Sequence, residues 1–172
     1  VVKTWLAFGL AFFLTGCGQE SVQSKPEIHI TGSTMGTYYS IKVADAAVTD
    51  AAKLQAEVDV LLERVNDQMS TYRPDSELSR FNQHKGNTPL VVSRDTARVV
   101  TEAIHIGRES RGALDVTVGP LVNLWGFGPD AKPTKVPSDE QITQTRQKTG
   151  LGNLHVVTSV DADTLQKDIP DL

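Results

Sequence analysis

Hydrophobic positions recur at every second residue in the first patterned part of the chain. The alternating apolar residues are Ile28 and Ile30 before the segment 31–37, and Tyr39, Ile41 and Val43 after it. A period of two is typical of a strand with one buried face, and the glycines inside the segment permit a turn or a bulge. The pattern therefore predicts two strands joined through residues 31–37.

A helical spacing replaces this alternation after residue 50. The apolar stripe consists of Leu54, Val58, Leu61, Leu62, Val65 and Met69. Residues at this spacing share one face of a helix. Thr49 and Asp50 offer side-chain oxygens for an N-cap, and Pro74 disfavours helix in the segment 70–76. We expect one long helix between these two points.

Three serines introduce further helices, because each offers a side-chain oxygen to the first turn of the helix after it. These serines are Ser76, Ser93 and Ser138. The helix after Ser138 begins with a capping box, and the helix after Ser93 is expected to end at Gly112. The residues expected to point inward from the helix after Ser93 are Val99, Val100, Ala103, Ile104 and Ile106.

The remaining apolar runs are short and predict strands. They lie at residues 90–92, 154–157 and 164–166. Leu114, Val116 and Val118 alternate with polar or small residues, which predicts a further strand that ends at 119–120.

Strands and helices are mixed along the chain without a regular βαβ rhythm. This order favours an α+β fold, with a mixed or antiparallel sheet and packed helices. Aromatic residues between glycines predict a turn at 123–129. Residues 167–172 have the pattern of a strand approach that stops within an element, so we expect the fold to be incomplete at the C-terminus.

The first seventeen residues have the features of a bacterial lipoprotein signal. Ten apolar residues run from Trp5 to Leu14, and a short small-residue site ends in Cys17. This run is shorter than the about 20 residues that a spanning helix needs. We predict a signal segment over 1–17 with Cys17 lipidated by palmitate, a polar tether over 18–26, and the domain over 27–172. An ordinary secretory peptide with an incidental cysteine is the alternative.

Charge and cysteine content argue against some classes of partner and of structural site. The 172 residues include 17 basic and 21 acidic ones, for a formal net charge of −4. The charges are scattered, and no stripe of Lys and Arg could follow a phosphate backbone, so we expect no nucleic acid partner. Cys17 is the only cysteine, which excludes a disulfide framework and a thiolate metal site.

Three segments carry candidate binding chemistry, each with a plainer alternative. Met35, within 32–37, can cover an apolar ring of a ligand, or the segment can be a simple hairpin turn. Tyr72 can stack on a flat heteroaromatic or serve as a packing residue. Asp115 can accept hydrogen bonds from a ligand or cap a turn. Phosphate-loop, dinucleotide-binding and zinc-protease motifs are absent from the sequence.

Together and in this order, these segments resemble the ApbE family, the FAD:protein FMN transferases. The matching stretches are 32–37, 69–72, 76–82 and 112–129. The last is the most specific of the four. The resemblance covers essentially the whole chain from Gly32 onward, and the lipoprotein signal is also typical of periplasmic members.

The resemblance implies an α+β fold with FAD as a substrate in a deep cleft. FMN passes through its phosphate to a Thr hydroxyl of a target protein, AMP leaves, and Mg²⁺ neutralises phosphate charge. It further implies that Met35 and Tyr72 contact the flavin nucleotide, together with the segment Ala113, Leu114 and Asp115. No catalytic residue is identified, and the metal ligands are expected after Leu172.

The resemblance also implies a place of action. We expect a lipid-anchored protein that faces the periplasm, on the inner membrane, and modifies target flavoproteins of membrane redox complexes. Three alternatives stay open. They are an FAD pyrophosphatase in which water replaces the Thr, a non-catalytic flavin-binding lipoprotein or truncated copy, and a secreted lipoprotein domain without flavin.

Overall fold

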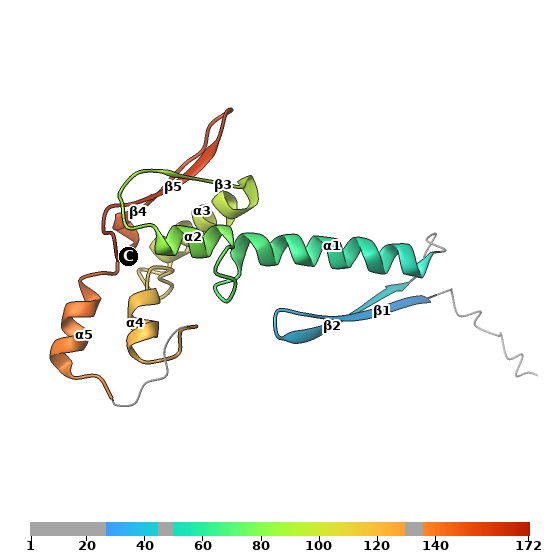
Figure 1. Ribbon diagram of the computed structural model, residues 1–172, viewed down its shortest axis with the longest axis horizontal. Coiled ribbons are helices and arrows are strands. Elements are labelled where there is room, and N and C mark those ends of the chain that lie inside the picture. Colours follow the sequence, from blue (N-terminus) through green and yellow to red (C-terminus); the bar gives the residue numbers. More distant parts are fainter. Residues whose placement is uncertain (1–26, 45–49, 130–135) are drawn as a thin grey trace, which may run out of the picture.

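The computed structural model describes residues 27–44, 50–129 and 136–172 (Figure 1). The predicted signal segment, Cys17 and the tether lie outside the described residues. In chain order the elements are β1 (Glu27–Thr34), β2 (Thr37–Ala44), α1 (Ala51–Met69), α2 (Glu77–Gln83), β3 (Leu90–Val92), α3 (Arg94–Glu109), α4 (Gly119–Leu124), α5 (Asp139–Arg146), the short 3-10 helix η2 (Leu151–Asn153), β4 (Leu154–Val157) and β5 (Asp163–Lys167).

β1 and β2 form the predicted antiparallel hairpin. Thr34 pairs with Thr37, so only two residues make the turn. Both turn residues have positive φ, 51° at Met35 and 73° at Gly36. Positive φ at both central positions is the requirement of a type I′ turn, which matches the twist of the flanking strands. The turn is shorter than predicted, because β1 extends through Thr34.

The hairpin lies along α1, and a glycine makes the close fit possible (Figure 1). Gly32 is the cross-strand partner of Tyr39. A Cβ at Gly32 would stand only 2.6 Å from the Tyr39 ring, so the ring occupies the space that a side chain would fill. Tyr39 Oη donates to Asp59 of α1 at 2.5 Å. Covering Gly32 thus brings Tyr39 into contact with the helix.

The second sheet has β5 at its centre. Its order is β3-β5-β4, and β5 is antiparallel to both neighbours. The three predicted strands near 90, 154 and 164 are therefore confirmed. The buried core beside this sheet consists of Phe81, Val92, Ala97, Ile104, Leu154 and Leu165.

α3 contacts β4 and β5 through a face rich in small residues. Its buried residues are Thr96, Ala97, Ile104 and Gly107. The prediction that Val99 and Ile106 point inward is wrong, since these side chains are 51% and 44% exposed. Val99 follows the buried Ala97 by two positions, and Ile106 follows the buried Ile104 by two. Two positions turn about 200° around the helix axis, so both side chains point away from the buried face. Gly112 follows the helix end as predicted, and its N–H donates to the Gly107 carbonyl at 2.8 Å.

Residues 110–118 form a loop, so the strand predicted from Leu114, Val116 and Val118 is wrong. These three side chains are between 37% and 44% exposed. Asp115 Oδ1 accepts hydrogen bonds from the backbone N–H of Thr117 at 2.8 Å and from its hydroxyl at 2.6 Å. Such a local side-chain bond competes with strand pairing.

A short helix, α4, begins at Gly119, where the predicted strand was expected to end, and its last two residues replace the first two of the turn expected at 123–129. Pro120 lies in its first turn, where backbone N–H groups have no acceptor within the helix, so proline removes no helical hydrogen bond. The glycine-containing turn starts only after Leu124. α5 begins with the predicted capping box between Ser138 and Gln141. Among the described residues, no helix combines the length and the apolar character needed to cross a bilayer.

Candidate functional site

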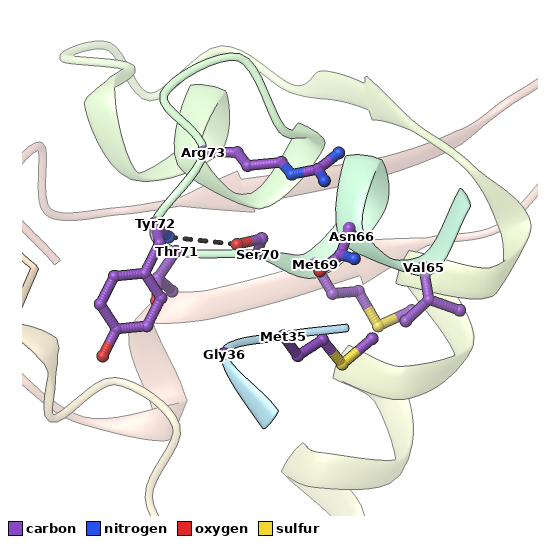
Figure 2. Close-up of a pocket in the computed structure, with 9 residues that line it drawn as sticks. All are labelled: Met35, Gly36, Val65, Asn66, Met69, Ser70, Thr71, Tyr72 and Arg73. Carbon is purple, nitrogen blue, oxygen red and sulfur yellow. Dashed lines mark hydrogen bonds between the residues drawn. The ribbon is translucent and has the colours of Figure 1, made fainter. Parts of the chain in front are cut away.

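A cavity of about 690 Å³ lies where the hairpin tip meets the C-terminal end of α1 (Figure 2). Three segments line it. They are the hairpin turn with Met35 and Gly36, the last turns of α1 with Val65, Asn66 and Met69, and the connecting segment from Ser70 to Arg73. The volume falls in the range of about 300–1,000 Å³ that is usual for small-molecule sites.

Two methionines and a valine give the cavity an apolar wall. Figure 2 shows Met35 of the turn on the same side as Met69 and Val65 of α1. Met35 is 54% exposed and has φ 51°, a conformation that costs a non-glycine residue about 1–2 kcal/mol. Thioethers are polarisable and adapt to flat aromatic surfaces. This wall can cover one face of a planar apolar ring.

Asn66 joins the hairpin tip to α1. It is buried at 7% exposure, and its Nδ2 donates to Thr34 Oγ1 at 3.2 Å. Thr34 directly precedes Met35, so this bond holds the methionine at the end of the helix. A polar residue on the apolar stripe of α1, one position after Val65, is the sequence signal that could have identified it.

Tyr72 stands at another edge of the cavity with a free ring (Figure 2). The side chain is 79% exposed, and its backbone N–H donates to Ser70 Oγ at 3.3 Å. A tyrosine with an anchored backbone and an uncovered ring fits the stacking alternative better than the packing one. The structure thus brings Met35 and Tyr72, which are 37 positions apart in the chain, to one cavity.

Arg73 fixes the connecting segment to α1. Its guanidinium donates to Glu63 at 2.7 and 3.0 Å and to Asp67 at 2.7 Å. Hydrogen bonds from Arg73 hold the pKa of the Glu63 carboxyl below its ordinary value, and the same bonds raise the pKa of Arg73. Both groups are charged at neutral pH, so the contact persists there.

The segment Ala113, Leu114 and Asp115 lies outside this cavity. Asp115 holds the turn at Thr117, and the buried Thr117 hydroxyl accepts from the Gly150 N–H at 2.6 Å. The hydrogen bonds of Asp115 therefore follow the turn-cap alternative. A second cavity of about 600 Å³ begins at the next residues, Val116 and Thr117, and shares Thr71 with the first.

The second cavity carries charged residues that sequence reasoning missed. Asp171 accepts from Lys85 at 2.8 Å and from Lys148 at 3.2 Å. These bonds lower the pKa of the Asp171 carboxyl. Across the described ranges, no group of three or more His, Cys, Asp or Glu side chains could hold a metal ion. We therefore assign no metal ligand.

Comparison with known proteins identifies the family to which this chain is similar. The sequence model of the ApbE family matches residues 35–172. The FAD:protein FMN transferase of Vibrio cholerae serotype O1 is 50% identical over 173 residues, which cover 99% of this chain and 49% of that protein. The enzyme of the same name from Haemophilus influenzae is 41% identical, over 97% of this chain and 48% of its own length.

Solved structures agree with the predicted α+β class. The flavin transferase ApbE from Vibrio cholerae superposes with a TM-score of 0.79 at 54% identity, over 86% of this chain and 47% of that one. The apo flavinyl transferase ApbE of Pseudomonas stutzeri gives a TM-score of 0.75 at 34% identity, over 86% and 48%. The chain spans about half the length of the curated relatives it matches.

Proposed function

The chain belongs to the ApbE family, and from this membership we propose that it carries a flavin-binding surface of an FAD:protein FMN transferase. The observation that supports the proposal most directly is the cavity between Met35, Met69 and Tyr72. Its apolar wall and free aromatic ring suit an isoalloxazine, which is a flat heteroaromatic with an apolar dimethylbenzene end.

In the proposed reaction, FMN moves from FAD to a Thr hydroxyl of a target protein. The Thr oxygen forms a bond to the phosphorus of the FMN moiety, the pyrophosphate P–O bond breaks, and AMP leaves with the bridging oxygen. The hydroxyl proton passes to a base that we do not assign. Positioning supplies much of the rate in phosphoryl transfer, so a rigid flavin site contributes directly.

Individual residues have distinct proposed roles in binding. Met35 covers one face of the flavin ring, and Tyr72 stacks on it from the other edge of the cavity. Ala113 and Leu114 offer backbone groups to the nucleotide, and Asp115 holds that backbone in place through its turn. The resemblance also implies Mg²⁺, but the described residues contain no matching ligand cluster. We therefore derive no step through the metal.

We also propose that the protein is anchored at Cys17 and faces the periplasm, where it modifies flavoproteins of membrane redox complexes. The apolar run of ten residues before Cys17 supports this proposal. Labelling of growing cells with an alkyne-bearing palmitate analogue tests it. The wild-type protein is expected to take up the label and Cys17→Ser to lose it, and equal labelling of both would overturn the anchor.

Calorimetric titration with FAD tests the flavin site directly. We expect Tyr72→Ala to weaken FAD binding roughly 5- to 150-fold, because base-type stacking on an aromatic ring contributes on the order of 1–3 kcal/mol. Tyr38→Ala is the matched control. Tyr38 of β2 is an equally exposed tyrosine, at 81%, but it lines neither cavity. Equal losses in both variants would contradict the placement of the flavin.

Mass spectrometry of an acceptor domain tests the transfer itself. With FAD, Mg²⁺ and an acceptor that carries a target Thr, the proposal expects a gain of one FMN on the acceptor. Release of free FMN and AMP without a modified acceptor would favour the pyrophosphatase. Tight FAD binding without either product would favour a flavin carrier.

A further inference from the structure

One backbone carbonyl at the end of α1 receives two buried hydroxyl groups. Ser76 Oγ donates to the Ser70 carbonyl at 2.6 Å, and Ser79 Oγ donates to the same oxygen at 3.1 Å. Ser76 and Ser79 are 1% and 5% exposed. A carbonyl has two lone pairs, so these two donors use its full accepting capacity. Residue 70 is thereby tied to α2.

Ser76 takes part in a second bond with a different purpose. Its Oγ accepts from the Ser79 N–H at 3.0 Å, which caps α2. One hydroxyl therefore both starts the helix and closes the loop 70–76 on itself. The Ser79 hydroxyl only closes the loop, because its Oγ donates to the Ser70 carbonyl and does not cap α2.

The loop is held at its middle as well. Arg73 binds Glu63 and Asp67 of α1, and the Arg73 carbonyl accepts from the Ser76 N–H at 3.2 Å. Tyr72 lies between the Ser70 anchor and the Arg73 anchor. Its backbone is thus fixed on both sides, while its ring is exposed beside the cavity (Figure 2). A fixed backbone reduces the ordering cost of binding a ligand, because only the ring remains to be ordered.

We infer that Ser76 and Ser79 are positioning residues for the flavin site: through the Ser70 carbonyl they hold the loop that presents Tyr72 to the flavin. This inference rests on the proposed function and names two residues that do not line the cavity. Their effect on the flavin is indirect and passes through the loop. Loss of their hydrogen bonds should therefore weaken flavin binding although every cavity-lining side chain is chemically unchanged.

The test combines hydrogen exchange of the flavin-free protein with calorimetric titration of FAD. Ser79→Ala removes one donor to Ser70 and leaves the α2 cap. We expect faster exchange of the amides in 70–76 and about fivefold weaker FAD binding, the loss that one net hydrogen bond represents. Ser79→Thr keeps the hydroxyl and is expected to restore both values.

A pair of variants at residue 76 separates the two tasks of its hydroxyl. Ser76→Asp keeps a good N-cap acceptor but its carboxylate cannot donate to the Ser70 carbonyl. Ser76→Thr keeps both abilities. We expect the Asp variant to loosen the loop and weaken FAD binding, and the Thr variant to behave like the wild type.

Ser138→Ala is the control for stability, because Ser138 caps α5 by accepting from the Gln141 N–H at 3.3 Å and lines neither cavity. It is expected to lower the melting temperature without changing FAD affinity. Wild-type exchange and affinity in Ser79→Ala would overturn the inference. If the wild-type protein itself binds no FAD, the proposed function fails, and the exchange data alone then decide whether the two hydroxyls hold the loop.

Discussion

Gly107 of α3 provides a direct test of how the loop 113–115 is supported. The residue is buried in the last turns of the helix, where the helix meets that loop. A Cβ at this position would stand 2.8 Å from the Leu114 carbonyl oxygen and would also overlap the Leu151 side chain. Leu151 can rotate away, but a backbone carbonyl cannot move without displacing its loop.

The expected cost follows from two opposing effects in Gly107→Ala. Overpacking a close contact costs about 1–3 kcal/mol. Alanine in a helix gains about 1 kcal/mol over glycine. Because the Cβ would meet a backbone oxygen, we take the upper end of the overpacking cost and expect a net loss of about 2 kcal/mol in the free energy of unfolding. For a chain of this size that corresponds to a melting temperature lower by roughly 4–8 °C.

Differential scanning calorimetry and FAD titration measure the two consequences. Besides the lower melting temperature, FAD binding should weaken, because the displaced loop carries Ala113 and Leu114. Gly152→Ala is the matched control, since a Cβ at Gly152 meets no atom within 4 Å. Its melting temperature should stay equal or rise slightly. A Gly107→Ala melting temperature at or above the wild-type value would refute the packing argument.

Three further substitutions have defined outcomes. Asp115→Ala removes two hydrogen bonds to Thr117 and should lower the free energy of unfolding by about 1–3 kcal/mol in chemical denaturation. Burial lowers the pKa of Lys167. The buried charge therefore reduces the free energy of unfolding below the lowered pKa, and this cost disappears as the pH rises from the lowered pKa to the ordinary 10.5. Across that interval the wild type should gain stability relative to Lys167→Met in chemical denaturation, and a constant difference between the two would contradict the argument. Two lysines lower the pKa of Asp171, so its contribution is present above the ordinary 3.8 and is lost as pH falls through the lowered value. Asp171→Asn should therefore match the wild type in strong acid and be less stable near neutrality, as acid titration of unfolding would show.

Helix starts were the most predictable features, because cap chemistry is local. Asp50, Ser76, Ser93 and Ser138 each accept a hydrogen bond from the backbone N–H three residues later. The side chain, the amide and the turn that joins them all lie within four residues. Sequence spacing alone therefore contains the information that fixes these positions.

The predicted strand at 114–118 failed because alternation does not supply a pairing partner. A strand forms only where another segment can bond to its backbone, and that partner is remote in sequence. Asp115 instead bonds to Thr117, two residues away. The carboxylate that was singled out as a possible ligand contact thus stabilises a local turn that competes with the strand.

The candidate cavity was predictable only in part. Met35 and Tyr72 were identified from the sequence, and the structure brings them together. The contribution of Val65, Asn66 and Met69 was missed, since their spacing predicts only a buried helix face. Their role depends on the hairpin lying along α1, and that arrangement follows from contacts such as Tyr39 with Asp59. Such tertiary contacts leave no periodic signal.

The central place of β5 sets the order in which the chain can fold during synthesis. β3 ends at Val92, but its partner β5 begins only at Asp163. β4 also pairs with β5, so neither strand can complete the sheet before β5 is synthesised. At about 5–20 residues per second, β3 remains without its partner for roughly 4–14 s. The contacts between the β1–β2 hairpin and α1 involve only residues 27–69, so these elements can pack against each other during that interval. The hairpin and α1, which line much of the first cavity, are thus built first, and the β3-β5-β4 sheet closes last.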